Sequence, residues 1–292
     1  MHTFTRYIAL VLCTCLLQAC GGGSDSAAPQ APARLVGEVF STGAEIASSD
    51  LRTTAGYTGN PSTSRAIQAA GRQNILDLLF MLHPAEGTDA LIAPDAEQQL
   101  VAYVRAHGDL LTPGIRVLVQ DEIFWQLCQG CATPAYLQAK LEALQTVVRL
   151  VRRHIPQAAV GITVTPYAVF EHPLVQDYLP RAIALVDWVG TDPYWLGDPR
   201  VIDKLHEWSA TFPAMAQQAH PGVETWFIAQ AFKFPDWDGA TFDAFIARQL
   251  AYAEGYDHIL FFGWQFASEL GAETQGRHFP PQTKALYAKY LK

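Results

Sequence analysis

From Arg34 onward, short apolar segments alternate with longer amphipathic segments, and this alternation limits the fold more than any other feature of the sequence. The short segments are rich in β-branched and aromatic residues, which predicts strands. They span residues 35–40, 75–82, 115–122, 160–165, 186–191, 225–230 and 259–264. Strands that are apolar along their whole length are covered on both faces, as in a parallel sheet flanked by helices.

Residues typical of helix ends mark the segments between these strands. Asp95, with Gln98 three residues later, predicts a capping box at the start of a helix that ends at the next glycine. Thr133 and Pro134 predict the start of a second helix. The apolar face of this second helix is formed at helical spacing by Leu137, Leu141, Leu144, Val148 and Val151.

Repeated strand–helix units in a chain of this length predict an α/β fold, the (β/α)8 TIM barrel, as a single domain over residues 34–292. Seven strands are recognisable, so we expect one more, short or irregular, within the Ser-, Thr- and Gly-rich stretch 41–71. An open, doubly wound sheet is the alternative architecture. No Gly-rich phosphate-binding motif follows a predicted strand, which argues against a nucleotide-binding version of that fold.

Residues 1–19 have the pattern of a signal peptide. Arg6 supplies a positive charge, residues 7–17 are apolar but too few to span a bilayer, and the Leu-x-Ala-Cys ending at Cys20 resembles the bacterial lipobox. That resemblance implies acylation of Cys20 and a protein anchored by lipid in the bacterial cell envelope, on the periplasmic or outer-membrane side. Residues 20–33 would then be a flexible tether, with membrane contact through the lipid alone. The alternative is an ordinary secretory signal with an incidental Cys.

Cysteine usage agrees with export. Cys128 and Cys131 are the two cysteines beyond Cys20, and their Cys-x-x-Cys spacing in an oxidising compartment predicts a small structural disulfide. A redox-active pair would need a thioredoxin-like setting, and a zinc site would need two further ligands nearby. The intervening Gln129 and Gly130 supply neither.

Composition and missing motifs exclude several classes of function. The formal net charge of -8 disfavours a general nucleic-acid binder. Aromatic residues make up 11% of the chain, which suits either a large core or a sugar-binding surface. No histidine pair has metal-ligand spacing and no Gly-x-Ser-x-Gly motif occurs, so the sequence predicts neither a metal site nor a serine hydrolase and implies no cofactor.

Polar and aromatic residues collect at the predicted C-terminal ends of the strands, where (β/α)8 barrels carry their active sites. Side chains alternate along a strand, and we expect polar ones to point into the barrel because the outward face packs on helices. Carboxyl groups, amides, phenols and indoles together suit a sugar site. The candidates are Glu38, Asp121, Glu122, Trp125, Tyr167, Asp192, Tyr194, Trp195, Gln230, Trp264 and Gln265, whereas Trp188 and Trp208 are assigned to the core.

These strand ends resemble clan A of the glycoside hydrolases, retaining enzymes built on a (β/α)8 barrel. Asp121-Glu122 is similar to the acid/base position that ends strand four, residues 189–194 to strand six with its site Tyr, and residues 262–264 to strand eight with its Trp. The resemblance implies a polysaccharide or oligosaccharide substrate. The clan's nucleophile is a Glu that ends strand seven, whereas this sequence has Gln230, a neutral amide that cannot form a glycosyl ester.

Three hypotheses follow from Gln230. A second carboxylate could come from Asp192, Glu38 or Asp121, and a wide separation from Glu122 would make the enzyme inverting. A substrate group such as an N-acetyl carbonyl could instead be the nucleophile, with Asp121 and Glu122 as orienter and acid. Alternatively the barrel binds glycan without catalysis, as a glycan-binding or polysaccharide-assembly lipoprotein.

We predict that Glu122 is the general acid for hydrolysis of a glycosidic bond, with a pKa raised toward neutrality by its aromatic surroundings. Asp192, or with less support Glu38, is the predicted partner carboxylate. Structural roles compete with each assignment: Glu122 could pair with a basic side chain, Asp121 and Asp192 could stabilise turns, and Glu38 could pair with Arg116.

Overall fold

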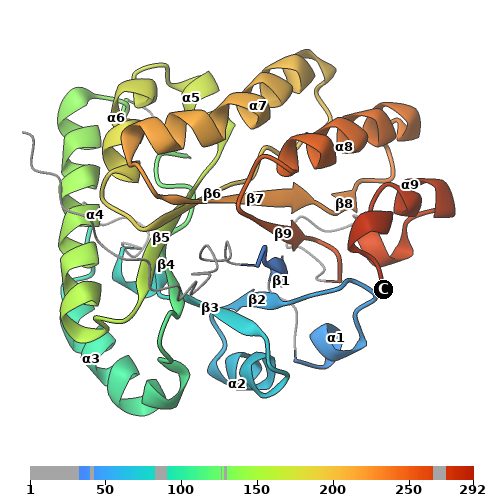
Figure 1. The fold of residues 1–292 in the computed structure, drawn as a ribbon. Coiled ribbons are helices and arrows are strands. Elements are labelled where there is room, and N and C mark those ends of the chain that lie inside the picture. Colours follow the sequence, from blue (N-terminus) through green and yellow to red (C-terminus); the bar gives the residue numbers. More distant parts are fainter. Residues whose placement is uncertain (1–32, 40–42, 83–90, 126, 128–129, 266–273) are drawn as a thin grey trace, which may run out of the picture. The chain divides into compact units, whose positions relative to one another are not determined.

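The computed structural model describes residues 33–39, 43–82, 91–125, 127, 130–265 and 274–292, and within it Arg34–Lys292 forms one compact unit (Figure 1). The predicted signal peptide, tether and acylated Cys20 lie outside the described residues. Cys128 also lies outside them, so its disulfide with Cys131 stays a prediction. Among the described residues, no helix is both long and apolar enough to cross a membrane.

Eight parallel strands close into a barrel, which confirms the predicted (β/α)8 TIM barrel and excludes the open sheet. The strand missing from the sequence pattern is Ala55–Thr58, inside the expected stretch, and it escaped notice because Ala-Gly-Tyr-Thr contains no branched apolar residue. In barrel order the strands are β1 Val36–Val39, β2 Ala55–Thr58, β3 Gln73–Asp77, β4 Arg116–Gln120, β5 Ala159–Val164, β6 Trp188–Thr191, β7 Glu224–Gln230 and β9 His258–Phe262.

Helices follow most of the strands and surround the barrel (Figure 1). Thr133 caps its helix as predicted, by accepting a hydrogen bond from the Tyr136 backbone N–H. Asp95 does not form the predicted capping box, because its carboxylate accepts from the Gln99 side chain at 2.6 Å. The helices are α1 Gly43–Ser48, α2 Pro61–Ala69, α3 Ala96–His107, α4 Pro134–His154, α5 Pro166–Glu171, α6 Val175–Ile183, α7 Ile202–Ala219, α8 Gly239–Ala253 and α9 Pro281–Ala285.

The barrel interior is filled by large side chains set against small ones. Trp188, Trp226, Leu118 and Leu260 belong to a buried cluster that is separate from the core between strands and helices. Gly161 makes room for the Trp188 indole, because a Cβ there would lie 2.0 Å from that ring. The interior is therefore a packed core whose filling leaves space only toward one end.

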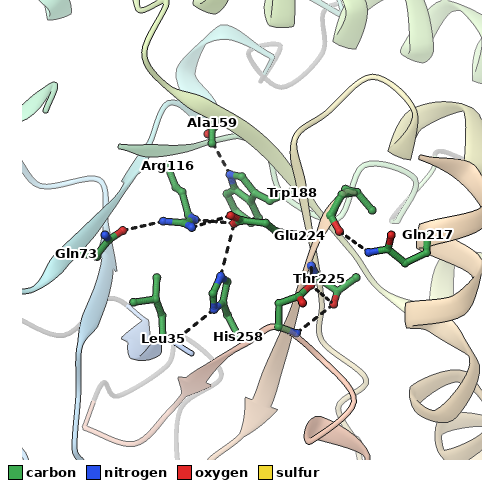
Figure 2. Close-up of polar contacts among 11 residues, drawn as sticks. Leu35, Gln73, Arg116, Ala159, Trp188, Gln217, Glu224, Thr225 and His258 are labelled. Atoms are coloured by element: carbon green, nitrogen blue, oxygen red, sulfur yellow. Dashed lines mark hydrogen bonds and ion pairs between the residues drawn. The ribbon is translucent and has the colours of Figure 1, made fainter. Parts of the chain in front are cut away.

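A polar network closes the N-terminal end of the barrel (Figure 2). Arg116 donates two hydrogen bonds of 2.8 Å to the Glu224 carboxylate and one of 2.7 Å to Gln73. Arg116 also lies over the Trp226 ring, and His258 places Nε2 3.6 Å from Glu224. Arg116 therefore pairs with Glu224, and the alternative pairing of Arg116 with Glu38 is wrong. With this end closed, the opposite end carries the cavity.

Candidate active site

A cavity of about 670 Å³ opens at the C-terminal ends of the strands, where the sequence predicts the site. Its floor is the top of the interior cluster, including Leu118, Ile228 and Leu260. Its walls are largely aromatic, and none of its described lining residues is Lys, Arg or His. The carboxyl groups in the lining belong to Asp121, Glu122, Asp192 and Asp236.

Asp121 and Glu122 follow strand four, and both line the cavity although they are neighbours in sequence. The pairing of β4 with β5 shifts register between Leu118 and Gln120. Glu122 then has a φ of 43°, the left-handed region that a residue with a side chain rarely occupies. This conformation breaks the usual alternation of side chains between two faces, so consecutive carboxyl groups reach one cavity.

Thr163 on β5 holds this unusual backbone in place. Its Oγ1 accepts a hydrogen bond of 2.8 Å from the Glu122 backbone N–H and donates one to the Asp121 carboxylate. Its carbonyl oxygen accepts from the Ile123 N–H at 3.3 Å. One threonine therefore fixes both acids, and strain of this kind, held by surrounding contacts, is typical of functional sites.

The Glu122 and Asp192 carboxyl groups both line the cavity and are hydrogen-bonded to each other. Burial raises the pKa of Glu122 to about 7, with the nearby Asp121 charge adding to the effect and the Asp192 hydrogen bond opposing it. Burial and the facing Glu122 charge raise the pKa of Asp192 well above its ordinary value. Two carboxyl groups in contact cannot both ionise easily, so their proximity and burial disfavour the doubly ionised pair.

Asp192 is 6% exposed and follows strand six. Its backbone carbonyl accepts from the Tyr194 N–H at 2.7 Å, which forms the turn considered from the sequence. Its side chain nevertheless lines the cavity, and Oδ1 has no hydrogen-bond partner among the described residues. Turn geometry and a buried acceptor without a described partner therefore coexist at this residue.

Tyr194, Tyr167 and Trp125 line the cavity, as the sequence predicts for sugar-binding residues. The Tyr194 ring stacks on Phe262, with centroids 5.6 Å apart and an interplanar angle of 22°. Tyr167 donates to the Tyr194 carbonyl oxygen at 2.9 Å, and burial raises the pKa of Tyr167 to about 12. Burial also raises the pKa of Tyr194 well above its ordinary value, so both phenols stay protonated and can donate hydrogen bonds.

Sequence reasoning missed several lining residues. Trp188, which we assigned to the core, belongs to the interior cluster and also forms part of the cavity floor. The two-stranded antiparallel sheet of β8 Phe232–Lys233 and β10 Thr274–Gln275 has no periodic signal in the sequence. The segment after β8 brings two further aromatic side chains to the cavity wall. The other missed lining residues are Tyr57, Thr163, Thr165, Leu196, Phe232, Phe234, Asp236, Trp237 and Phe262.

Glu38 is absent from the cavity lining, contrary to its prediction as a candidate carboxylate. Its carboxylate accepts from the Ser49 hydroxyl and from Gln265 Nε2 at 3.0 Å, and the residue is completely buried. The interior position on this strand belongs to the next residue, Val39. Our rule that polar strand residues point inward fails here, because the barrel and its helices bury both faces of β1.

Gln230 and Trp195 contact each other and lie outside the cavity lining, contrary to their prediction as sugar ligands. Gln230 Oε1 accepts from the Trp195 backbone N–H at 2.8 Å, and Nε2 donates to the carbonyl oxygens of Trp195 and Phe232. The Trp195 indole is 3% exposed and donates to the Asp198 carbonyl oxygen. Both side chains are used in fixing the loop after β6.

Trp264 and Gln265 also lie outside the cavity lining. Trp264 is 1% exposed, packs on Tyr287 and Phe261, and donates to Asp50 Oδ1 at 2.8 Å. Gln265 donates to Glu38 and to the Glu45 carbonyl oxygen. The residues of strand eight that do reach the cavity are Leu260 and Phe262.

The described residues contain no group of three His, Cys, Asp or Glu side chains arranged to hold a metal ion. The described site supplies a hydrogen-bonded carboxyl pair, two further carboxyl groups, hydroxyl donors and aromatic faces.

No protein-family model matches this chain, and no curated protein matches it in sequence. Its fold is similar to a psychrophilic glycoside hydrolase family 10 endo-β-1,4-xylanase, with a TM-score of 0.58, 11% identity, and 87% of this chain and 96% of that chain covered. It is also similar to an FMN-binding β-glucuronidase from Facaelibacterium prausnitzii L2-6, with a TM-score of 0.58, 10% identity, and coverage of 90% and 45%.

A Bacteroides uniformis β-glucuronidase matches with a TM-score of 0.51 and 12% identity over 79% of this chain and 30% of that chain. The chain therefore spans less than half of these two glucuronidases but nearly all of the xylanase. At these identities the likeness establishes the fold, a glycoside hydrolase-like (β/α)8 barrel.

Proposed function

We propose that this protein hydrolyses glycosidic bonds of an oligosaccharide or polysaccharide, with Glu122 as the proton donor. The observation that carries the proposal is the position of Glu122 in the cavity, in hydrogen-bond contact with Asp192, where burial raises the pKa of Glu122 to about 7. An ordinary glutamate would be ionised at neutral pH and could not donate a proton. A group with a pKa near the working pH is the effective general acid.

The described residues suit the first half of such a reaction. Glu122 gives its proton to the leaving oxygen as the glycosidic bond lengthens, and Asp192 keeps that proton available by sharing it. The aromatic walls supply flat apolar faces for the C–H side of a sugar ring, while Tyr194 and Tyr167 supply hydroxyl groups. No cofactor takes part in this scheme.

The pair is too close for the two common arrangements of glycosidases. Retaining enzymes separate their carboxyl groups by about 5–5.5 Å and inverting enzymes by about 6.5–9.5 Å, on opposite faces of the sugar. Glu122 and Asp192 touch, so they act from one side as a unit. We therefore assign the proton donor to this pair, and we assign neither of its two carboxyl groups as the nucleophile.

The cellular setting in this proposal is the bacterial envelope. Acylation at Cys20 would anchor the barrel to a membrane, on the periplasmic or outer-membrane side, and place its cavity near cell-surface polysaccharide. Labelling with a fatty-acid probe, comparing the wild-type protein with Cys20→Ala, tests the anchor. A variant that keeps its label would contradict this assignment.

The decisive test of hydrolysis uses the Glu122→Gln variant on a panel of glycans. We expect turnover to fall by about 10²–10⁴-fold while glycan binding persists, because the amide keeps the shape but loses the proton. Exposed Glu207 offers a matched control, and Glu207→Gln should leave turnover unchanged. Full hydrolysis by Glu122→Gln would refute the assignment.

Glycan binding without catalysis is the second candidate, and the neutral, fully hydrogen-bonded Gln230 at the end of strand seven favours it. In that case the wild-type protein binds glycan with no release of reducing ends, and Glu122→Gln changes nothing but affinity. Measuring binding and reducing-end release on the same samples separates the two functions.

A further inference from the structure

We infer that the substrate carries a 2-acetamido group beside the scissile bond, and that its carbonyl oxygen is the nucleophile of the reaction. This inference rests on the proposed function and names its substrate class: β-linked glycans of N-acetylated hexosamines. Three independent features of the cavity lead to it: the spacing of its carboxyl groups, the free acceptor on Asp192 and the nature of its floor.

The first feature is that neither the end of strand seven nor the Glu122–Asp192 pair supplies a nucleophile among the described residues. Gln230 occupies the end of strand seven and uses both ends of its amide on backbone groups. Glu122 and Asp192 are in hydrogen-bond contact, so they do not flank a sugar as the acid and the nucleophile of a retaining enzyme do. A nucleophile that arrives with the substrate removes the need for a second carboxylate on the far face of the sugar.

The second feature is the free acceptor on Asp192. Its Oδ1 is buried in the cavity wall and has no hydrogen-bond partner among the described residues. A buried acceptor without a donor is unfavourable, and a ligand N–H at this point would satisfy it. An acetamido N–H donates only to the ionised or unprotonated oxygen, so its binding localises the shared proton on Glu122, where the leaving oxygen needs it.

The third feature is the floor of the cavity. Ile75, Leu118 and Leu260 form an apolar surface below the carboxyl pair, which suits the methyl of an acetyl group. The absence of Lys, Arg and His among the described lining residues disfavours an anionic sugar such as a uronic acid. A free hexosamine would leave the apolar floor empty, whereas its N-acetyl form fills it.

The reaction balances with water as the only co-reactant. The acetamido oxygen bonds to the anomeric carbon from the face opposite the leaving group, the glycosidic C–O bond breaks, and the Glu122 proton passes to the leaving oxygen. Asp192 holds the N–H of the resulting oxazolinium ion. Water then adds to the anomeric carbon, gives its proton to the Glu122 carboxylate, and reopens the ring with overall retention of configuration.

Attack from the opposite face requires the leaving group to lie trans to the 2-acetamido group, which defines β-linked gluco or galacto substrates. The test compares three matched sets of β-linked oligosaccharides in both series: 2-acetamido, 2-amino and 2-hydroxy. We expect turnover of the 2-acetamido set to exceed that of the other two by at least ~10²-fold, the size of an intramolecular nucleophile's advantage in its weakest form.

Two readouts report the nucleophile directly. Progressive fluorination of the acetyl methyl makes the carbonyl oxygen a poorer nucleophile, so kcat should fall steeply along the series. A protein nucleophile or direct attack by water would give a flat series and overturn the inference. A hexosamine-derived thiazoline, which resembles the closed-ring intermediate, should inhibit the wild-type protein and protect it against thermal unfolding.

The variants keep this inference distinguishable from the proposed function. Asp192→Asn should lower kcat by at least ~10²-fold on 2-acetamido substrates, whereas Asp203→Asn, on the exposed face of α7, should not. Circular dichroism checks that Asp192→Asn is folded. Glu122-dependent hydrolysis of the 2-hydroxy or 2-amino set would overturn the inference and keep the proposed function. No hydrolysis of any set would overturn both.

Discussion

The two ends of the barrel each contain a partly or largely buried glutamate, and the two have opposite electrostatics. At the N-terminal end, burial tends to raise the pKa of Glu224, but hydrogen bonds from His258 and Arg116 outweigh it and lower the pKa to about 2. At the C-terminal end, burial raises the pKa of Glu122 to about 7, and the facing group is another acid. A glutamate is thus an ionised structural residue at one end of the barrel, whereas at the other end a glutamate keeps its proton up to a higher pH.

The difference shows where the fold is stabilised and where it is strained. The N-terminal network joins the first residues of four strands, so its charges are compensated and hold the barrel closed (Figure 2). The carboxyl pair at the other end has no described basic residue in the lining around it. An uncompensated buried charge costs free energy, which natural proteins accept mainly at functional sites.

Breaking the N-terminal network should have the largest effect on stability. Glu224→Gln leaves the Arg116 charge without its counter-ion, and we expect a loss of about 2–3 kcal/mol in the free energy of unfolding, reduced from the fully buried case because Glu224 is part-exposed. Urea unfolding monitored by Trp fluorescence measures it. Turnover per folded molecule should not change. A large loss of kcat in this variant would show that the N-terminal network also contributes to catalysis, contrary to the separate roles assigned to the two ends.

Raising the pH should lower the free energy of unfolding through the carboxyl pair at the C-terminal end of the barrel. Glu122 has a folded pKa of about 7 against an ordinary value of 4.5, so its contribution is present below pH 4.5 and is lost as the pH rises toward 7. The loss is on the order of 2–3 kcal/mol. For Glu224 the sign is reversed, because its pKa of about 2 gives stability above pH 4.5 that is lost as the pH falls.

Urea unfolding between pH 5 and 8 reports the C-terminal pair together with His206. Burial lowers the pKa of His206 to about 4, so this residue makes stability rise with pH up to about 6.5, and the pair is isolated by comparing the wild type with variants. The combined variant Glu122→Gln and Asp192→Asn should remove the contribution of the pair to this dependence, whereas Glu207→Gln should not. Turnover should fall over the same range as Glu122 loses its proton. An equal pH dependence in the wild type and in the combined variant would mean that the pair is not protonated in the folded protein.

Removing one acid of the pair should stabilise the protein. Asp192→Asn keeps the shape and ends the repulsion with Glu122, so we expect a gain of about 1 kcal/mol in the free energy of unfolding at pH 8 and little change at pH 5. Differential scanning calorimetry at the two pH values measures it. A loss of stability at pH 8 would show that other groups in the folded protein stabilise the Asp192 charge.

The smallest expected effect is at Tyr167. Tyr167→Phe removes the hydrogen bond to the Tyr194 carbonyl oxygen, and we expect a cost of about 1 kcal/mol in stability. A rise in KM without a large change in kcat would agree with a role in positioning the turn that carries Asp192. Thermal unfolding and steady-state kinetics on one preparation give both values.

The sequence allowed the barrel to be predicted because parallel strands buried on both faces read as continuous apolar segments, and only β2 lacks that pattern. The same burial explains why the site was predicted less completely. When both faces of a strand are buried, hydrophobicity does not show which face is inside, so Glu38 could not be told apart from an inward-pointing acid. Asp121, Glu122 and Asp192 were identified by their position after a strand, which does not depend on the face.

Aromatic residues were the hardest to assign. Trp264 and Trp195 follow strands, as platforms would, but their indoles pack between the barrel and its helices. Trp188 begins its strand, yet its ring reaches the cavity floor because Gly161 leaves room for it. Such exchanges of large for small side chains between strands are set by packing and leave no local mark in the sequence.

The left-handed backbone at Glu122 gives this position an evolutionary consequence. Glycine would adopt that conformation without the cost of about 1 kcal/mol that a side chain incurs, and asparagine would tolerate it better than glutamate. A descendant that no longer needed the carboxyl group would gain stability by making either replacement. Drift at this single codon should therefore separate lineages that have kept the chemistry from lineages that have abandoned it.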